Sequence, residues 1–543
     1  MIARIDDWLA GIARRGASVL LLALSLALFL PGFFTMPPLD RDEPRFAQAS
    51  RQMVASGDII DIRFQDEARH KKPAGIYWLQ SATIVLTGGG DAPIWYYRLP
   101  SLLAALAAVL LTARIAAEFL GPRGGLVAGL LFAGVFSLGM EARIAKTDAV
   151  LLLTVLGSQW VLARLWRQSR EAGFGQVTLN LGELAAFWLA MSASLLVKGP
   201  VGPMVVGLTA VALAVGARRA GWLAALRPAR GLLVTALLVL PWYVAISLRS
   251  DGGFWAASLG EDMLAKLAEG QEKHGAPPGS YLAAIWFTFF PASIALALSL
   301  PALWRARRSA AFLFAAAWVL PAWLVFEATP TKLTHYVLPL YPALALAVAS
   351  VWDGVVTAQR RLWHWIVFGL VAALPLIALV AIAIKSAELG PVPWGPIGLG
   401  IVALVAAGAL AARALAQGRA LTAAAGLALM GFASPVGVAT SLIAVEAIWP
   451  APRIVAAAVT ADCPAPAIHQ RGFGEPSLVF LSPGPVRPLG NTDHAAVLSD
   501  PCGRVLLPSA EGAPMQGAVA LGRITGVSLG SGDALDLTLW AAP

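Results

Sequence analysis

Long apolar segments recur through most of this chain of 543 residues, and they limit its fold more than any other feature. A membrane-spanning helix needs about 17–25 mostly apolar residues. Only 13% of the residues are charged, whereas a soluble domain carries about 25%. The sequence therefore predicts an all-α integral membrane protein with about thirteen transmembrane helices. The predicted spans are residues 17–36, 98–120, 124–140, 148–165, 181–197, 200–217, 231–248, 281–303, 309–327, 336–352, 364–384, 394–412 and 421–446.

The first apolar segment has two interpretations, a cleaved signal peptide or a retained helix. Arg4, Arg14 and Arg15 precede it, as basic residues precede the apolar part of a signal peptide. The segment is, however, nearly long enough to cross a bilayer, and it ends in Pro-Gly-Phe-Phe without a small-residue cleavage site. We therefore expect a retained transmembrane helix.

Arginine clusters between the predicted spans indicate the orientation of the chain. They fall on one side of the membrane, for example at Arg14 and Arg15 and from Arg305 to Arg308, and the positive-inside rule makes that side cytoplasmic. The sequence thus predicts a multi-pass protein of the bacterial inner membrane, with a cytoplasmic N-terminus and a periplasmic C-terminal part. Because these topogenic charges explain the formal net charge of +9, the charge does not indicate nucleic-acid binding.

Four connections on the opposite side are long or unusual in composition, at 37–97, 140–147, 249–280 and 328–335. The few lysines of the chain also fall on that side, although the cytoplasmic connections use only arginine. A lysine ammonium is a compact, hydrated charge that suits phosphate binding. We therefore expect several of these lysines to be functional. The eight lysines of the chain are Lys71, Lys72, Lys146, Lys198, Lys266, Lys273, Lys332 and Lys385.

The composition changes after residue 446, where Pro, Gly, Asp, Ser and Thr become frequent. Alternating stretches such as Pro476 to Leu481 and Gly503 to Leu507 predict short strands. The sequence therefore predicts two domains, a transmembrane domain at 1–446 and a small periplasmic α/β domain at 447–543. Both cysteines, Cys463 and Cys502, lie in the second domain, and a periplasmic location permits a disulfide between them.

The densest group of ionisable side chains lies in the first predicted periplasmic loop, residues 37–97. Charged residues next to a span are costly to place, so they are candidates for a functional site. A helix is predicted at 46–54 and an extended segment at 58–64. The polar motifs are Asp40-Arg41-Asp42-Glu43-Pro44-Arg45 and, about thirty residues later, Arg69-His70-Lys71-Lys72-Pro73, which Tyr77 and Trp78 follow.

Two of these motifs together carry a family resemblance. Asp-Glu-x-Arg-Phe-Ala at 42–47, followed by Lys-Pro-x-x-x-Tyr-Trp at 72–78, resembles the integral membrane glycosyltransferases that use polyprenyl-phosphate sugars. That superfamily includes the protein O-mannosyltransferases and the lipid A aminoarabinose transferases, and the second branch is the closer match. The stretches 142–148, 198–200 and 331–339 are similar to the same superfamily. The resemblance covers about residues 15–350 and implies a fold of the GT-C type.

The resemblance implies roles for individual residues. Asp42 corresponds to the essential carboxylate of the family, and Lys72, with Arg45 and Lys71, is expected to bind the lipid phosphate of the donor. The residue before this lysine is often acidic in the family but is Lys71 here, so a metal contact at that position stays open. Further residues are expected to line the substrate cavity: Glu43, Tyr77, Arg143, Asp148, Lys198, His274, Lys332, His335 and Tyr336.

Several of these residues also have purely structural interpretations. Tyr77 is typical of the aromatic belt at the level of the lipid headgroups. Asp148 can cap its helix together with Thr147, and Lys198 can extend its charge from a helix end toward water. Asp42 can be an architectural ion-pair partner of Arg45.

The chemistry of these residue types fits the resemblance. Breaking a bond between a sugar and a phosphate requires neutralisation of the leaving phosphate, which lysine, arginine or a divalent cation can supply. Asp42 can act as a general base on an acceptor hydroxyl. If the acceptor is an ionised phosphate, no base is required, and Asp42 would orient the acceptor or stabilise an oxocarbenium-like sugar. The sequence leaves both roles open.

The expected function is transfer of a monosaccharide from an undecaprenyl-phosphate donor to lipid A or a related periplasmic glycolipid. Protein O-mannosylation and O-antigen modification are alternatives within the same enzyme class. A lipid or sugar transporter is the alternative outside it. Transporters place ionisable groups near the bilayer midplane, often in broken helices of inverted repeats. Here the charges cluster at one face, which favours an enzyme.

Overall fold

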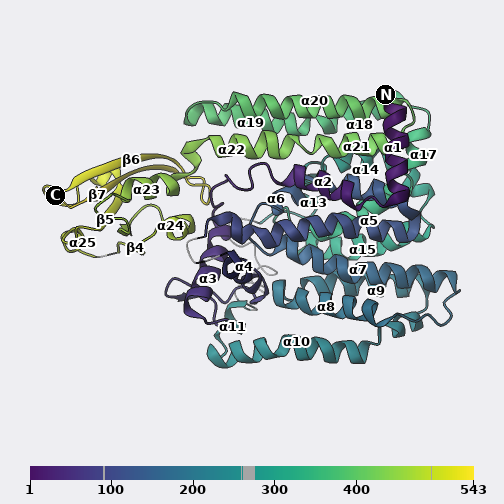
Figure 1. The fold of residues 1–543 in the computed structure, drawn as a ribbon, viewed down its shortest axis with the longest axis horizontal. Coiled ribbons are helices and arrows are strands. Elements are labelled where there is room, and N and C mark those ends of the chain that lie inside the picture. Colours follow the sequence, from purple (N-terminus) through teal and green to yellow (C-terminus); the bar gives the residue numbers. More distant parts are fainter. Residues whose placement is uncertain (88, 90–91, 259, 261–274, 491, 543) are drawn as a thin grey trace.

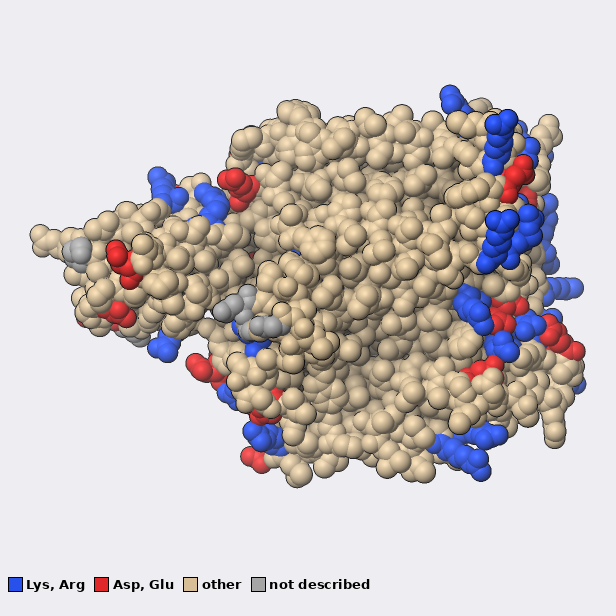
Figure 2. Space-filling model, viewed as in Figure 1, with Lys and Arg blue, Asp and Glu red and all other residues tan. Residues whose placement is uncertain are grey.

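Helices lie side by side in a large bundle, and a small mixed sheet projects from one end of it (Figure 1). The structure is a computed structural model that describes residues 1–87, 89, 92–258, 260, 275–490 and 492–542. Charged side chains gather at the two ends of the bundle, and the face shown in Figure 2 carries almost none between them. An apolar belt between two charged ends is what a bilayer requires.

In the described part of the chain, eight helices are long and apolar enough to cross a membrane, or up to ten if each bent pair is one span. The multi-span helical fold that the sequence predicts is therefore confirmed. The long helices are α5 (Ile94–Ala133), α7 (Asp148–Glu171), α8 (Leu181–Lys198), α10 (Pro228–Arg249), α15 (Ala310–Ala328), α18 (Leu362–Ala372) with α19 (Leu374–Leu389), α20 (Trp394–Ala416), and α21 (Ala420–Met430) with α22 (Thr440–Ala444).

Two bent pairs and two shorter apolar helices complete the bundle. The bent pairs are α1 (Ile2–Arg15) with α2 (Ser18–Phe29), at 115°, and α13 (Ser280–Thr288) with α14 (Ala292–Arg305), at 118°. The shorter ones are α9 (Val201–Ala217) and the segment Leu338–Ala349, which contains η4 (Leu338–Leu340) and α16 (Tyr341–Ala349). Each of the apolar segments predicted from the sequence coincides with one of these helices or with half of α5.

Helix α5 is broken at Gly121, which has φ 68° and ψ −176° and is followed by Pro122. In a continuous helix, residues 113 and 125 would lie about 18 Å apart. A Cβ atom added to Gly125 would instead lie 2.7 Å from the carbonyl oxygen of Ala113. The chain therefore reverses at Gly121, and the two halves correspond to the separate predicted spans 98–120 and 124–140.

Helix α1 was not among the predicted elements. It buries Ile2, Leu9 and Ala13 and carries Arg14 and Arg15 in its last turn, so it is amphipathic rather than uniformly apolar. Figure 1 shows it crossing the ends of the long helices. The Asp6 carboxylate anchors it by accepting a hydrogen bond from the Thr422 amide at 2.9 Å.

The first loop folds into a compact layer over one end of the bundle. It contains α3 (Asp42–Ser56), the two-stranded pair β1 (Arg63–Phe64) and β2 (Glu67–Ala68), and α4 (Gly75–Thr87). The predicted helix at 46–54 lies inside α3, and the predicted extended segment ends in β1. Ser50 of α3 donates a hydrogen bond to Gln80 of α4 at 2.7 Å, which joins the two helices.

The C-terminal domain is a five-stranded mixed sheet with the order β4-β3-β5-β7-β6. Its strands are β3 (Ala467–Gln470), β4 (Val486–Pro488), β5 (Gly503–Pro508), β6 (Val519–Val527) and β7 (Ala534–Ala541). Strand β3 pairs in parallel with β4 and β5, while β7 is antiparallel to β5 and β6. Helix α23 (Pro450–Ala458) precedes the sheet. Cys463 and Cys502 form a disulfide with a Cα–Cα distance of 5.5 Å.

One predicted strand of this domain is wrong. Pro476–Leu481 forms the helix α24, whereas Gly503–Pro508 is a strand as predicted. Proline at the first helical position has a φ angle suited to a helix, and the preceding Glu475 is extended. The Arg51 guanidinium of α3 lies 4.2 Å from the ring centroid of Phe480, so α24 docks the domain onto the first loop.

The remaining described elements are short. Except for η5, which lies between α21 and α22 inside one candidate span, they are connections at the bundle ends and between strands. They are α6 (Phe136–Glu141), η1 (Gly221–Leu226), α11 (Gly253–Trp255), α17 (Trp352–Thr357), η5 (Ala433–Ala439), η6 (Glu446–Ile448), α25 (His494–Leu498) and η7 (Ser509–Glu511).

Candidate active site

A polar cavity of about 620 Å³ lies where the first loop, several helix ends and the C-terminal domain meet. Its walls come from segments that are nearly 500 residues apart in the sequence. Among the residues that line it are Asp40, Arg41, Asp42, Glu43, Arg45, Arg69, Lys71, Lys72, Lys146, Asp148, Lys198, His335, Tyr336, Leu529 and Gly530. The structure thus brings together most of the residues that the sequence predicts as a site.

Asp42 is the first residue of α3 and borders this cavity. Burial alone would raise the pKa of its carboxyl group. Lys146, Arg69, Lys72 and Arg45 oppose that effect, and together they hold the pKa of Asp42 below its ordinary value of 3.8. Asp42 is therefore ionised at neutral pH, and cations surround it.

A second set of buried charges faces Asp42 across the cavity. Lys198, at the end of α8, lies 2.5 Å from the Asp148 carboxylate, at the start of α7. Lys146 Nζ lies 3.2 Å from Glu141 and 3.5 Å from His335 Nδ1. The Thr147 side chain makes no capping hydrogen bond, so the Asp148 carboxylate serves to hold lysines rather than to cap a helix with Thr147.

An apolar cavity of about 930 Å³ adjoins the polar one. The two share Lys71, Lys72, Lys198 and Tyr336 in their walls. The rest of the apolar cavity is formed mainly by aliphatic and aromatic side chains of α9, α10 and α15, including Val201, Met204, Val239, Leu240, Val244, Leu248, Val325 and Phe326. A phosphate at the shared lysines would therefore have a long apolar trough beside it.

Comparison with known proteins supports the resemblance of the motifs. Residues 71–244 match the family model described as dolichyl-phosphate-mannose-protein mannosyltransferase. The crystal structure of ArnT from Cupriavidus metallidurans bound to undecaprenyl phosphate has the same fold, with a TM-score of 0.75 at 19% identity. That likeness covers 97% of this chain and 99% of the other. The chain is therefore similar to these proteins in sequence over part of its length and in fold over nearly all of it.

Two curated relatives have the name undecaprenyl phosphate-alpha-4-amino-4-deoxy-L-arabinose arabinosyl transferase. The one from Edwardsiella ictaluri (strain 93-146) is 27% identical over 326 residues, which are 59% of this chain and 56% of the relative. The one from Pseudomonas aeruginosa (strain UCBPP-PA14) is 29% identical over 330 residues, which are 59% of this chain and 58% of the relative. The chain therefore spans less than two thirds of the length of the curated relatives it matches.

Not every predicted site residue faces the open space of the polar cavity. Glu43 borders the cavity, but its carboxylate accepts hydrogen bonds from Arg98 Nε at 2.7 Å and Arg98 Nη2 at 2.9 Å. It also accepts hydrogen bonds from the backbone amides of Leu39 and Ala145, each at 2.8 Å. These four bonds satisfy the carboxylate, so the geometry favours a structural role for Glu43.

Three further predicted residues lie outside the polar cavity. Arg143 is fully buried and donates to backbone carbonyl oxygens, including that of Pro31 at 2.9 Å. Tyr77 is also fully buried, and its hydroxyl accepts a hydrogen bond from Arg69 Nε at 3.3 Å. Lys332 donates to the carbonyl oxygens of Ala276 and Thr329. His274 lies outside the described residues.

Other residues at the cavity were not among the predicted site residues. Lys146 lies within the stretch 142–148 that resembles the family, and Arg69 lies three residues before the motif at 72–78, so their positions were a usable signal. Asp40 also borders the cavity, and it accepts hydrogen bonds from the amide and hydroxyl of Ser477 at 2.9 and 2.5 Å. Burial raises the pKa of Asp40 to about 6. Because Ser477 belongs to the C-terminal domain, local sequence around Asp40 could not reveal this contact.

The C-terminal domain closes one side of the cavity with the turn between β6 and β7. Leu529 and Gly530 of this turn line the cavity. A Cβ atom added to Gly530 would lie 2.3 Å from Glu475 Oε1 and 2.8 Å from Arg41 Nε. The turn thus packs tightly against the loop that carries Asp42.

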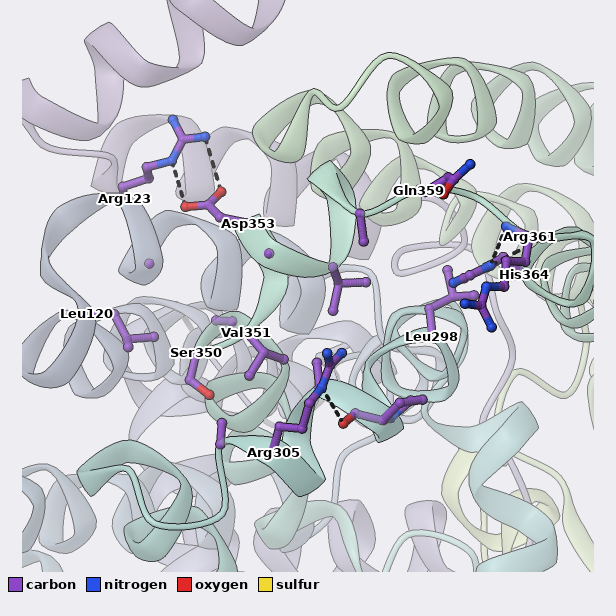
Figure 3. Close-up of a pocket in the computed structure, with 18 of the residues that line it drawn as sticks. Leu120, Arg123, Leu298, Arg305, Ser350, Val351, Asp353, Gln359, Arg361 and His364 are labelled. Atoms are coloured by element: carbon purple, nitrogen blue, oxygen red, sulfur yellow. Dashed lines mark hydrogen bonds and ion pairs between the residues drawn. The ribbon is translucent and has the colours of Figure 1, made fainter.

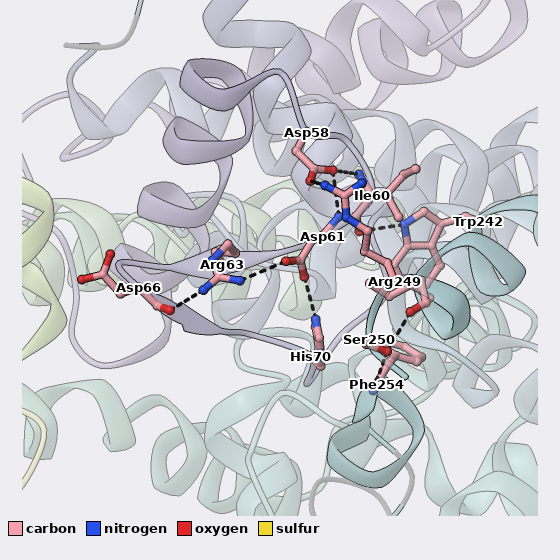
Figure 4. Close-up of polar contacts among 11 residues, drawn as sticks. Asp58, Ile60, Asp61, Arg63, Asp66, His70, Trp242, Arg249, Ser250 and Phe254 are labelled. Carbon is pink, nitrogen blue, oxygen red and sulfur yellow. Dashed lines mark hydrogen bonds and ion pairs between the residues drawn. The ribbon is translucent and has the colours of Figure 1, made fainter. Parts of the chain in front are cut away.

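A polar network supports the segment that carries Lys71 and Lys72 (Figure 4). His70 Nε2 lies 2.8 Å from the Asp61 carboxylate. Arg249, at the end of α10, pairs with Asp58 at 2.7 Å, and Trp242 of α10 donates to the Ile60 carbonyl oxygen at 3.3 Å. The first loop is therefore tied to the helix that lines the apolar cavity.

Lysine and arginine supply the positive charge of the polar cavity. The described residues contain no group of three or more His, Cys, Asp and Glu side chains arranged to hold a metal ion. A divalent cation at the donor phosphate stays an open alternative, as in the sequence analysis.

Proposed function

We propose that this protein transfers 4-amino-4-deoxy-L-arabinose, or a similar monosaccharide, from undecaprenyl phosphate to lipid A or a related periplasmic glycolipid. The observation that carries the proposal is the pair of adjoining cavities, one cationic and one apolar, which share Lys71, Lys72, Lys198 and Tyr336. This arrangement matches a ligand with an anionic phosphate and a long isoprenoid chain. The names of the curated relatives supply the sugar and the lipid phosphate.

The proposal includes a bacterial inner-membrane location and an orientation. All thirteen predicted segments cross the membrane in a domain that comprises residues 1–446, and the domain at 447–543 lies in the periplasm. Arginine-rich connections gather at the end of the bundle where the N-terminus lies (Figure 2). The positive-inside rule makes that end cytoplasmic. The polar cavity at the opposite end then opens to the periplasm.

The donor phosphate binds where the two cavities meet. Lys72, Lys71 and Arg45 contact its oxygens, while the isoprenoid follows the apolar cavity between α9, α10 and α15. When the bond between the anomeric carbon and the phosphate oxygen breaks, the phosphate takes the electron pair and gains negative charge. Fixed cations in a partly buried cavity stabilise that charge without reorganisation, which lowers the barrier.

Asp42 acts on the acceptor side. Its lowered pKa makes it a weak proton acceptor, so orientation of the acceptor or stabilisation of a positively charged sugar fits better than proton abstraction. A phosphate of lipid A is already ionised, and its oxygen attacks the anomeric carbon without losing a proton. The products are the glycosylated phosphate and free undecaprenyl phosphate.

Reconstitution tests this proposal. The purified chain in lipid nanodiscs receives undecaprenyl-phosphate aminoarabinose and lipid A, and mass spectrometry follows both lipids. We expect lipid A to gain one aminoarabinose for each undecaprenyl phosphate released. Movement of an unaltered sugar lipid across liposomes, without transfer, would identify a transporter and overturn the proposal.

A protein acceptor is the second candidate, because the matched family model describes a protein mannosyltransferase. The same assay with polyprenyl-phosphate mannose and a mixture of periplasmic proteins distinguishes the two. Sugar found on protein and absent from lipid A would replace the glycolipid acceptor with a protein.

A further inference from the structure

A cavity of about 1140 Å³ lies at the other end of the bundle, remote from the polar cavity around Asp42. It is formed by the reversal of α5 near Arg123, the end of α14 at Arg305, helix α17 and the start of α18. None of the residues predicted for sugar transfer lines it. Its size and composition therefore need an explanation other than the proposed reaction.

Positive charge dominates the wall of this cavity. Figure 3 shows Arg305 between the Arg123–Asp353 pair on one side and Arg361 with His364 on the other. The Asp353 carboxylate accepts hydrogen bonds from Arg123 Nε and Nη2, each at 3.2 Å, so Arg123 balances its negative charge. Arg305 donates to the Pro301 carbonyl oxygen at 3.2 Å. Within the described ranges, neither Arg305 nor Arg361 has a carboxylate partner, so an anion would complete the site.

An apolar groove of about 420 Å³ continues from the cavity along the bundle. The cavity and the groove share Pro301 and Trp363. The groove lies between α14 and α18 and is lined by Trp286, Ala297, Leu300, Pro301, Trp363, Val367, Leu370 and Val371. Leu300 and Leu370 are 53% and 67% exposed in the apolar belt of the bundle, so the groove faces lipid.

We propose that this site binds an anionic phospholipid, with its phosphate at Arg305 and Arg361 and an acyl chain in the groove between α14 and α18. A soluble anion would leave the groove unused, whereas a zwitterionic lipid would bring its own cation to an already cationic wall. Basic pockets between helices at a membrane surface suit anionic headgroups. In the orientation proposed above, the lipid belongs to the cytoplasmic leaflet.

Native mass spectrometry of the full chain tests the proposal, with phosphatidylglycerol and phosphatidylcholine added separately in neutral detergent. We expect the wild type to bind phosphatidylglycerol in preference to phosphatidylcholine. Each arginine near an anionic lipid contributes about 1 kcal/mol, so R305Q/R361Q should weaken phosphatidylglycerol binding about thirtyfold. Ala297→Trp, which fills the groove without a change of charge, should also weaken it.

The matched control is R307Q/R308Q, which removes two charges from the same end of the bundle outside the cavity. It should retain the preference for phosphatidylglycerol. Equal weakening by both double variants would reduce the effect to general surface charge and overturn the site. Equal binding of the two lipids, or displacement of phosphatidylglycerol by millimolar inorganic phosphate, would also overturn it. Undecaprenyl phosphate binding and melting temperature, measured on each variant, separate loss of this site from misfolding and from failure of the proposed function.

Discussion

Two neighbouring carboxylates, Asp42 and Glu43, lie in very different surroundings. Glu43 also borders the polar cavity, but its carboxylate is held by Arg98. Arg98 is fully buried and uses its three guanidinium nitrogens on Glu43 and on the carbonyl oxygens of Phe33, Met36 and Pro37. Asp42 borders the cavity itself, among cations that lower its pKa. A buried carboxylate whose hydrogen bonds are complete holds structure even at a cavity wall, whereas a carboxylate that borders the cavity among cations is available to a ligand.

The same contrast separates two buried arginines, Arg98 and Arg143, from the lysines of the polar cavity. Arg98 and Arg143 bind backbone carbonyl oxygens that the ends of neighbouring helices leave unpaired. Lys72, Lys146 and Lys198 surround a volume large enough for a ligand. The planar fork of arginine suits several fixed acceptors, while a lysine ammonium adapts to an incoming phosphate.

Removal of Arg98 should have the largest effect on stability. Arg98→Ala leaves the buried Glu43 carboxylate without its partner, and breaking a buried ion pair costs about 3–5 kcal/mol. Thermal or denaturant unfolding of the purified protein measures the loss. Arg523→Ala, which breaks the exposed Arg523–Asp536 pair, is the control and should leave the stability almost unchanged, because water screens an exposed ion pair. If Arg98→Ala melted like the wild type but lost sugar transfer, the Arg98–Glu43 pair would belong to the catalytic site.

Asp42→Asn should cause the largest loss of activity. The amide keeps the shape of the side chain but removes the charge, and loss of one electrostatic contact in an active site costs about 10²–10³-fold in rate. The initial rate of transfer to lipid A measures the effect, and melting should stay near that of the wild type. Asp66→Asn, in the same loop but exposed, is the matched control. Full activity of Asp42→Asn would remove the proposed distinction between Asp42 and Glu43.

Lys72→Ala should act on donor binding. A hydrogen bond to a charged group contributes about 1.5 kcal/mol, so the affinity for undecaprenyl phosphate should fall about tenfold. Lys332→Ala is the control, since Lys332 lies outside the polar cavity. Direct titration with undecaprenyl phosphate compares the two variants. An equal loss in both would mean that the lysines act through general charge rather than through position.

The contact between Asp40 and Ser477 predicts a smaller, pH-dependent effect. Burial raises the pKa of Asp40 from 3.8 to about 6 in the folded protein, so the folded state binds the proton more tightly than the unfolded state. The contribution of Asp40 to stability should therefore be greatest below pH 4 and should fall as the pH rises to about 6. Melting temperatures across this range measure it. Asp40→Asn should flatten that part of the profile, and an unchanged profile would contradict the assignment.

The membrane-spanning part was predictable because the length of a hydrophobic segment is a local property of the sequence, and this length determines whether a helix can cross the bilayer. Even the reversal at Gly121 was visible as a separation between two apolar segments. The amphipathic α1 was missed, since half of its surface is polar and it does not cross the bundle. In the C-terminal domain, Pro476–Leu481 was misassigned because a six-residue pattern of alternation does not distinguish a strand from a short helix that starts with proline.

The residue types along the chain were enough to predict the chemical content of the candidate site: a carboxylate at the end of the first span and lysines concentrated on one face. They were enough because charged groups next to a bilayer are costly and rarely placed without a role. Which of these charges meet depends on the fold. Lys146 approaches Asp42 from about 100 residues away, and Arg98 binds Glu43 from 55 residues away. Leu529 and Gly530 reach the cavity from a separate domain. Whether a charge is satisfied or available depends on those distant partners, and no local pattern encodes them.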